Sequence, residues 1–407
     1  MSEKKSYIIL AISILIAVSS VSYAWFSAIL TGNDTAKKNT VVSGDLKLTY
    51  TDTNEMSLSN SVPGDSFEKT ITVANTGTLN ATYNLIWQEL NNGITNNELV
   101  IEATCKRLNS SNTEEGTCEG ISESAVNSVI LKNNILIEPK VTHEYTLKVT
   151  FKDTGLVQDY NKNKTFTGKL GIEEYKSTPF REESWSTIAA NVRAGNISGY
   201  NVGDTKEIDM GTYGIHRVRI ANLSTPSECS IEGFSQTACG FVVEFENILM
   251  NSQMNTTQTN KGGWPASKVY SLLNTDLYNV LPSDLKSSII DTTVVSGHGN
   301  TSGETNFTST DKFYLLSGKE IYSDFSSTYD TGKDLTRTLD YYVNKGVTTS
   351  SYSGAIKKYR TEASVWWLRA ATSNTTYSFS SVAVSGVYGY YYYAYESGGI
   401  VPAFRIG

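Results

Sequence analysis

Tyrosines crowd one short stretch near the C-terminus, and their side chains suit contact with a partner. The crowded residues are Tyr388, Tyr390, Tyr391, Tyr392, Tyr393 and Tyr395. Tyrosine combines a large, rigid contact area with a polar hydroxyl, which is typical of recognition surfaces. Together with Tyr377 and Arg369 they form the predicted ligand-binding face. The alternatives are inward packing or an adhesive β-edge for the tyrosines, and a structural ion pair for Arg369.

Strand geometry limits how many of these tyrosines can belong to a core. In an extended strand the even-numbered tyrosines from 388 to 392 face one side, and the odd-numbered ones from 391 to 395 face the other. Only one set can enter a core, so the other is exposed or covers another surface. The preceding Trp366 and Trp367 also point to opposite faces, so at least one is expected in the core.

Histidines are few, and the sequence contains no recognised catalytic motif. The three histidines are His143, His216 and His298, and the sequence has no His-Glu-x-x-His helix. His143 and Glu144 lie in an alternating strand, where the i+4 spacing of that motif would not bring two ligands to one metal, and His216 is expected to be a core residue. A nucleophile elbow, a P-loop and a dinucleotide fingerprint are also missing from the sequence. We predict a protein that is not an enzyme, with no catalytic residues, metal or cofactor.

Four cysteines fall into two pairs in polar, loop-like sequence. Cys105 and Cys118 are 13 residues apart, and Cys229 and Cys239 are 10 apart. Two local disulfides are the simplest of the three possible connectivities. Loops of this length stabilise a fold by about 3 kcal/mol each in the chain-entropy account. Zinc is the alternative, but neither pair has Cys-x-x-Cys spacing or a histidine nearby in the sequence.

Residues 1–30 have the features of a signal peptide or a membrane anchor. Lys4 and Lys5 precede a largely apolar stretch, and Ser22-Tyr23-Ala24 supplies small residues for cleavage after Ala24. Residues 25–30 prolong the apolar stretch, which keeps a retained anchor open. In either case the rest of the chain is exported. We predict a secreted or surface-attached protein that meets the membrane only through an uncleaved N-terminal segment.

Composition limits the possible fold classes and binding partners. The chain has 407 residues, which favours more than one domain, and a net charge of −7 without a basic block. Binding to nucleic acid through phosphate contacts is therefore not expected. Charged residues are sparse, and the abundance of Ser, Thr, Asn, Gly and Tyr favours strands and turns. The expected fold class is mainly β and multidomain.

Hydrophobic patterns divide the chain into two parts. Short alternating segments separated by polar turns predict a β-sandwich over residues 38–175. Residues 176–184 are polar and predict a linker. Over residues 185–407, strands mix with a helix that begins at Trp264-Pro265, a shorter helix at 283–290 and a loop at 296–310. The second part is therefore expected to be an α+β domain.

The first part resembles the TasA/camelysin family of Gram-positive surface proteins. The resemblance covers residues 1–175 and is carried by Ser22-Tyr23-Ala24-Trp25-Phe26-Ser27, Val41-Val42-Ser43-Gly44-Asp45-Leu46, Val62-Pro63-Gly64-Asp65-Ser66 and Ala74-Asn75-Thr76-Gly77-Thr78-Leu79-Asn80-Ala81. It implies an immunoglobulin-like or jelly-roll sandwich in a biofilm-fibre or cell-surface protein. It also implies that a freed N-terminal strand can pair with a neighbouring subunit. Camelysin has been classed as a metallopeptidase, which the histidines of this chain do not support.

The second part resembles an uncharacterised domain of exported Firmicutes proteins. The resemblance rests on Trp185, Gly263-Trp264-Pro265, Trp366-Trp367-Leu368-Arg369 and Gly399-Ile400-Val401-Pro402-Ala403-Phe404. Its layout is similar to C-type-lectin-like domains of the formylglycine-generating-enzyme type and to targets of diversity-generating retroelements. The resemblance implies that residues 373–397 face a ligand. No cysteine follows Cys239, which argues against the oxidase activity, and the calcium and sugar motifs of C-type lectins are absent.

These patterns favour a binding protein. The expected function is an adhesin-like surface protein that displays a tyrosine-rich face on a β-sandwich stalk, with an unknown protein or glycan ligand. A structural subunit of a biofilm-type fibre is the alternative, with self-association through the N-terminal sandwich. A surface metallopeptidase is the third and weakest hypothesis.

Overall fold

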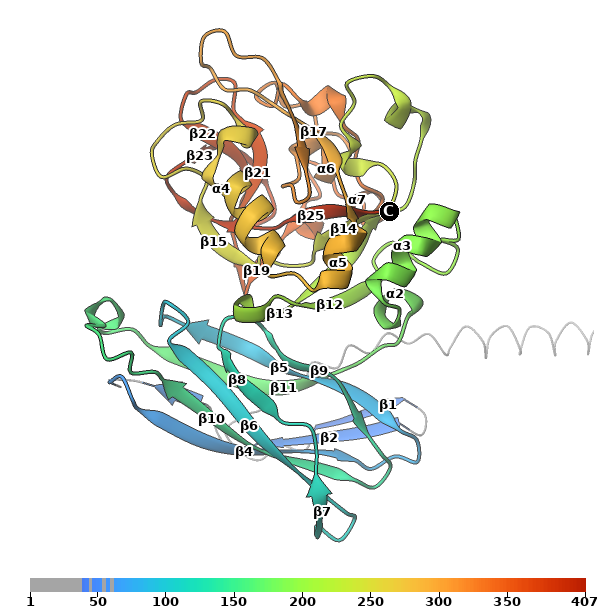
Figure 1. Cartoon of the computed structure of the whole chain (residues 1–407), viewed down its shortest axis with the longest axis vertical. Coiled ribbons are helices and arrows are strands. Elements are labelled where there is room, and N and C mark those ends of the chain that lie inside the picture. The colour runs from blue at the N-terminus through green and yellow to red at the C-terminus, as the bar shows by residue number, and fades with distance from the viewer. Residues whose placement is uncertain (1–38, 44–45, 53–55, 59–61) are drawn as a thin grey trace, which may run out of the picture.

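The computed structural model describes residues 39–43, 46–52, 56–58 and 62–407. Over these residues the fold is mainly β and consists of two bodies, which confirms the predicted fold class (Figure 1). The predicted signal peptide or anchor, residues 1–30, lies outside the described residues. None of the helices in the described part of the chain is long and apolar enough to cross a membrane.

The N-terminal body is a β-sandwich of antiparallel strands. Its first sheet has the order β1–β2–β4–β10–β6–β7, with β8 also paired to β6, and its second layer has the order β9–β5–β11–β3. The strands are β1 (Asn39–Ser43), β2 (Leu46–Asp52), β3 (Met56–Leu58), β4 (Ser66–Asn75), β5 (Ala81–Asn92), β6 (Leu99–Leu108), β7 (Glu114–Thr117), β8 (Ile121–Ala125), β9 (Ile130–Ile137), β10 (Thr142–Phe151) and β11 (Phe166–Glu174).

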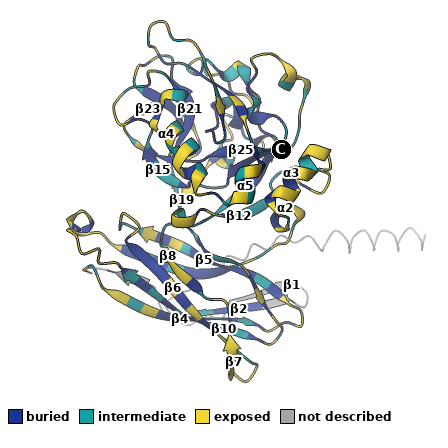
Figure 2. Ribbon diagram, viewed as in Figure 1, coloured by how far each residue is buried: buried dark blue, intermediate teal, exposed yellow. Residues whose placement is uncertain are grey.

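Alternation along the strands explains how the sandwich closes. In β10, Tyr145, Leu147 and Val149 are fully buried, whereas the residues between them are half-buried. The inward side chains belong to the same buried cluster as Trp87 and Leu170 of the opposite layer. Because successive strand residues point to opposite faces, a period of two buries one face of each sheet. Figure 2 shows the buried residues concentrated inside both bodies.

The C-terminal body surrounds a second hydrophobic core. A five-stranded sheet has the order β15–β24–β21–β22–β23, and two smaller hairpins pair β17 with β18 and β19 with β20. The strands are β12 (Thr205–Asp209), β13 (Ile215–Asn222), β14 (Val242–Phe245), β15 (Met250–Gln253), β16 (Ile289–Ile290), β17 (Thr292–Ser296), β18 (Phe307–Asp311), β19 (Lys357–Tyr359), β20 (Glu362–Ser364), β21 (Trp366–Ala371), β22 (Ser378–Val382), β23 (Tyr388–Tyr393), β24 (Ser397–Ile400) and β25 (Ala403–Ile406).

Short helices cover this second core. They are α2 (Pro179–Glu182), α3 (Trp185–Ala194), α4 (Lys268–Leu272), α5 (Ser283–Ser288), α6 (Gly318–Ile321) and α7 (Asp340–Asn344). The helix predicted from Trp264-Pro265 is present but begins later, because a 3-10 turn at Trp264–Ala266 precedes α4; a π-helical turn at Leu273–Leu277 then continues the helix. The shorter predicted helix is present as α5. The predicted loop at 296–310 is partly wrong, because β18 begins at Phe307 and pairs with β17.

One sheet runs through both bodies. Its order is β16–β25–β14–β13–β9–β5–β11–β3, and β12 also pairs with β13. The two bodies meet at the antiparallel pair of Ile215 on β13 and Ile130 on β9. Arg217 of β13 reinforces the junction: its guanidinium donates to both carboxylate oxygens of Glu173 on β11, at 3.0 and 2.5 Å. The polar sequence between the bodies therefore does not act as their only connection.

The predicted linker, residues 176–184, is packed against the C-terminal body. Its α2 buries Phe180 fully in the second core, where the ring meets Trp185 edge-on with 5.7 Å between ring centroids. The Arg181 guanidinium donates to Glu207 on β12, with Nε to Oε2 at 2.9 Å. A segment with a buried aromatic ring and a buried ion pair is held in place. It therefore fixes how the chain enters the second body.

Both predicted disulfides are present, Cys105–Cys118 and Cys229–Cys239. The described residues contain no free cysteine. Disulfides form and persist in oxidising compartments. The pairing therefore indicates an oxidising, extracytoplasmic environment.

The junction between the bodies gives a first testable prediction. Arg217→Ala is expected to lower the free energy of unfolding by about 1–3 kcal/mol, because it removes charge-assisted hydrogen bonds to Glu173 and Glu207 at a partly buried site. Urea denaturation followed by tryptophan fluorescence measures the change. Arg107→Ala is the matched control, because its ion pair with Glu138 is solvent-exposed and should contribute less than about 1 kcal/mol. Equal losses in the two variants would contradict a stabilising junction.

Candidate functional site

The five-stranded sheet ends on the edge strand β23, which carries most of the predicted binding tyrosines. On β21, two strands in from this edge, Trp366 and Trp367 are both fully buried. The Trp366 indole N–H donates to the Ala355 carbonyl at 3.1 Å, and that of Trp367 donates to the Ser252 carbonyl at 2.8 Å. Both indoles therefore belong to the frame that supports β23, which agrees with the expectation that at least one is core.

A β-bulge in β23 changes which tyrosines share a face. Ser378 pairs with Tyr393, and Val382 pairs with Tyr388. The two positions are four residues apart on β22 but five apart on β23, so β23 carries one extra residue. Tyr388 and Tyr393 therefore lie on the same face, although strict alternation predicts opposite faces. The expected division into even-numbered and odd-numbered tyrosines is wrong for this strand.

Two of the predicted contact residues pack against the frame. The Tyr388 ring meets Phe325 edge-on with 4.7 Å between centroids, and its hydroxyl shares a hydrogen bond of 2.8 Å with Ser380. The Tyr392 ring lies 4.5 Å from that of Trp367. Both tyrosines are half-buried. They therefore anchor β23 to the sheet and offer a partner less contact than the sequence suggested.

The remaining predicted tyrosines, together with Tyr329, form a partly exposed cluster on and beside β23. We call it the tyrosine face, and it consists of Tyr329, Tyr377, Tyr390, Tyr391, Tyr393 and Tyr395. Ring centroids are 5.4 Å apart for Tyr391 and Tyr393, and 5.8 Å apart for the stacked rings of Tyr393 and Tyr395. Tyr390, Tyr391 and Tyr395 are 43%, 47% and 37% exposed. Adjacent exposed aromatic rings of this kind usually mark an interaction site.

Tyr329 is a member of the tyrosine face that the sequence did not reveal. Its ring stacks on Tyr390 with 4.4 Å between centroids and an angle of 21° between the planes. It lies sixty-one residues before Tyr390, in polar loop sequence with no hydrophobic period. Nothing in the local sequence signals the contact, which is made when the loop folds beside β23.

The side chains of the tyrosine face carry no charge. The hydroxyls of Tyr377 and Tyr391 share a hydrogen bond, and this bond, with some desolvation, raises the pKa of Tyr391 above its ordinary value. The Tyr391 hydroxyl therefore stays protonated at neutral pH. The face can offer aromatic stacking and hydroxyl hydrogen bonds, and its own side chains offer no ion pairs.

Arg369 does not belong to the face, so its place among the predicted ligand-binding residues is wrong. The side chain is fully buried and pairs with Glu320 through two hydrogen bonds of 2.6 Å. Its Nε also donates to the Val295 carbonyl at 2.9 Å. The structural ion pair that the sequence left open is therefore the role that the structure supports, and Arg369 holds β21 to the segments beneath it.

A buried asparagine holds the loop that leads to the face. The Asn260 side-chain amide donates to the carbonyls of Thr375 at 3.0 Å and Ser378 at 2.9 Å, on the segment that carries Tyr377. The backbone N–H of Ser373 donates to the Tyr329 carbonyl at 3.0 Å. These contacts join three loops that are distant in the sequence. The tyrosine face is thus preorganised by its loops as well as by the sheet.

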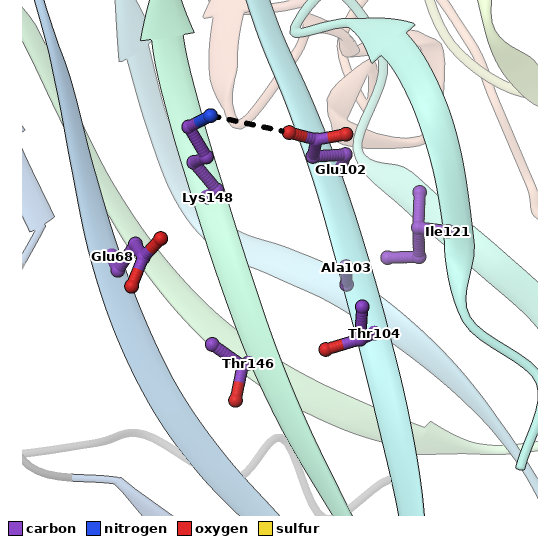
Figure 3. Close-up of a pocket in the computed structure, with 7 residues that line it drawn as sticks. All are labelled: Glu68, Glu102, Ala103, Thr104, Ile121, Thr146 and Lys148. Atoms are coloured by element: carbon purple, nitrogen blue, oxygen red, sulfur yellow. Dashed lines mark ion pairs between the residues drawn. The ribbon is translucent and has the colours of Figure 1, made fainter. Parts of the chain in front are cut away.

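A shallow hollow lies far from this face, on the sandwich (Figure 3). It is lined by Glu68, Glu102, Ala103, Thr104, Ile121, Thr146 and Lys148. Lys148 and Glu102 form an ion pair across it at 3.6 Å, with side chains that are 42% and 48% exposed. Such a pair is mostly solvated and contributes little. The hollow therefore has the character of an ordinary polar sheet face.

The fold and the face together define a disulfide-bonded, mainly β protein with an exposed aromatic cluster at one sheet edge. Residues 241–407, which include the whole of β21 to β25, match the family described as "Domain of unknown function (DUF6273)". The match covers less than half of the chain. No curated protein matches the chain.

Two solved structures are similar to parts of the chain. The enzymatically active domain of bacteriophage CBA120 tailspike protein 4 is 14% identical, over 32% of this chain and 20% of that one, with a TM-score of 0.16. The structure of infectious bursal disease virus, Gx strain, is 10% identical, over 36% of this chain and 43% of that one, with a TM-score of 0.14. This chain therefore spans less than half of either structure, and such TM-scores do not indicate a shared fold.

Proposed function

We propose that the protein is an exported bacterial surface protein that binds a ligand through the tyrosine face. In this proposal the N-terminal sandwich is a TasA/camelysin-like stalk, and the C-terminal body is a C-type-lectin-like scaffold that displays the face. The protein acts by contact and not by catalysis. The ligand is a neutral glycan or a protein surface that can stack on tyrosine rings and accept or donate hydrogen bonds.

One observation carries the proposal: adjacent aromatic rings lie at the surface of a sheet whose inner strand is buried and hydrogen-bonded. The half-buried Tyr393 contacts the exposed Tyr391 and Tyr395. On β21, two strands in from this edge, Trp366 and Trp367 are fully buried and hydrogen-bonded. A rigid support reduces the conformational entropy lost on binding. Rings that are already held in position therefore give tighter binding for the same contact area.

The test is the triple variant Tyr391→Ser, Tyr393→Ser and Tyr395→Ser in the full chain. Binding is measured on an array of neutral oligosaccharides and on mucin-coated surfaces. Loss of three adjacent aromatic contacts should weaken binding ~30-fold or more, which is about 2 kcal/mol. These side chains lie outside the core, so the melting temperature should stay close to that of the wild type.

The matched control is Val384→Ser with Val387→Ser, two exposed apolar residues in the turn just before β23. This variant removes apolar surface at the same end of the body without touching the tyrosines, and it should bind like the wild type. The proposal fails if the folded triple variant keeps full affinity for every probe that the wild type binds. It also fails if the wild type binds none of the probes.

A further inference from the structure

A buried histidine lies beside the disulfide of the sandwich. Cys105 is on β6, Cys118 follows β7, and His143 is on β10. Both sulfur atoms and an imidazole nitrogen lie within 4.8 Å of one another. Among the described residues, this is the one group of three such side chains close enough to hold a metal ion. Local sequence patterns do not reveal this group, because His143 is 25 residues from Cys118.

Strand pairing explains why these three side chains lie close together. Tyr145 pairs directly with Cys105, and His143 is two residues farther along β10, so its side chain points to the same face. Diagonal neighbours across an antiparallel pair are within reach of long or aromatic side chains. The backbone N–H of Cys118 donates to the Cys105 carbonyl at 3.1 Å, which holds the second cysteine against the same strand. All three ligands are therefore fixed by the sheet.

His143 is held in place by a tyrosine of the sandwich core. Its Nδ1 shares a hydrogen bond of 2.9 Å with the Tyr83 hydroxyl, which in turn shares one of 2.8 Å with the Tyr145 hydroxyl. Metal-binding histidines are commonly oriented by a hydrogen bond of this kind. Tyr83 is thus placed to orient the ring.

We propose that reduction of the Cys105–Cys118 disulfide turns this cluster into a Zn²⁺ site with two thiolate ligands and one imidazole ligand. An external dithiol supplies two electrons and two protons to the S–S bond and becomes a disulfide itself. Zn²⁺ then displaces the two thiol protons. Thiolates and a neutral imidazole are the ligands that zinc prefers, and a water molecule completes its four-coordination.

The accessibility of Cys118 and the comparison with the second disulfide both favour this site. Cys118 is half-buried, whereas Cys105 and His143 are almost fully buried, so a reductant and a metal ion reach the cluster from the side of Cys118. The other disulfide, Cys229–Cys239, belongs to no such group of ligands among the described residues. It provides an internal comparison, because both disulfides meet the same reductant. The proposal does not depend on the function proposed for the tyrosine face.

The experiment uses Co²⁺ as a spectroscopic substitute for Zn²⁺. The full chain is reduced with a phosphine under nitrogen, freed of reductant and titrated with Co²⁺. The expected result is one Co²⁺ per chain, with a thiolate-to-cobalt charge-transfer band in the near ultraviolet that Zn²⁺ abolishes. The oxidised protein should show no such band. A reduced protein that binds no Co²⁺ overturns the proposal.

Three variants identify the ligands. The matched control Cys229→Ser with Cys239→Ser should keep the band, and Cys105→Ser with Cys118→Ser should lose it. His143→Gln should weaken Co²⁺ affinity ~10-fold or more, since the loss of a ligand costs at least as much as the loss of an orienting partner. Near-ultraviolet circular dichroism checks the fold in each case. Unchanged affinity in either the Cys105 and Cys118 variant or the His143 variant overturns the proposal, as does binding that appears only when the tertiary signal is lost.

Discussion

Replacing Glu320 with alanine is expected to destabilise the C-terminal body by about 3–5 kcal/mol, because it leaves the Arg369 guanidinium buried without its counter-ion. Both side chains are fully buried and joined by two hydrogen bonds. Glu320 also accepts from the Thr336 hydroxyl at 2.7 Å and from the Ser317 backbone N–H at 2.9 Å. The variant would therefore orphan several polar groups at once, each of which adds to the loss.

Urea denaturation and thermal melting measure this loss. Glu102→Ala is the control, because Glu102 pairs with Lys148 on the exposed face of the sandwich and should change stability by less than about 1 kcal/mol. If Glu320→Ala proves no more damaging than Glu102→Ala, the buried ion pair does not hold β21 in place. The contacts between tyrosines on β23 should also weaken in a variant that still folds, because Arg369 lies on β21, which pairs with β22 in the same sheet.

The second large effect is a dependence of stability on pH that arises at Asp330. This carboxyl is almost fully buried; its Oδ1 accepts the Gly332 backbone N–H at 3.0 Å and its Oδ2 has no hydrogen-bond partner. Burial raises its pKa from 3.8 to about 6. Between these values the folded state binds more protons than the unfolded state, so the wild type loses stability as pH rises through this window.

Asp330→Asn removes this effect. The stability of the variant relative to the wild type should therefore rise between pH 4 and pH 7, by about 3 kcal/mol at most for a pKa shift of roughly two units. Urea midpoints of both proteins at the two pH values give the difference directly. A relative stability that is the same at both pH values would show that the buried carboxyl does not titrate as expected.

His143→Gln provides a control of opposite sign. Burial, aided by the positive charge of Arg107, lowers the pKa of His143 in the folded protein from 6.5 to about 4. The wild type therefore loses stability as pH falls from 6.5 toward 4, and the variant does not. Relative to the wild type, the His143 variant should lose stability as pH rises over this window, whereas the Asp330 variant gains it. Slopes of the same sign would point to a general effect of pH on the chain.

Local patterns in the sequence were enough to predict much of the fold. The alternation of Tyr145, Leu147 and Val149 with polar residues correctly predicted a strand with one buried face, because a period of two is typical of half-buried strands. The cysteine spacing gave both disulfides, because short loops favour local pairing. The helix expected at 283–290 is present as α5, whose N-terminal end follows Pro282.

Contacts between distant residues were beyond such patterns. Glu320 is 49 residues from Arg369, and many other carboxylates were equally plausible partners. The bulge in β23 depends on how β22 pairs with it, and a run of similar tyrosines contains no signal for the extra residue. Cys105 and His143 come close together only when β10 pairs with β6. The ion pair, the bulge and the cysteine–histidine group each depend on tertiary contacts, which local sequence patterns do not reveal.

The pairing of Ile130 with Ile215 gives the molecule a mechanical property. A load applied at the tyrosine face passes through the C-terminal body into β13, and from β13 to β9 and β11 by backbone pairing and by the Arg217–Glu173 contact. The load therefore reaches the sandwich without first extending the segment 176–184. Movement of the face relative to the sandwich therefore requires that these contacts break.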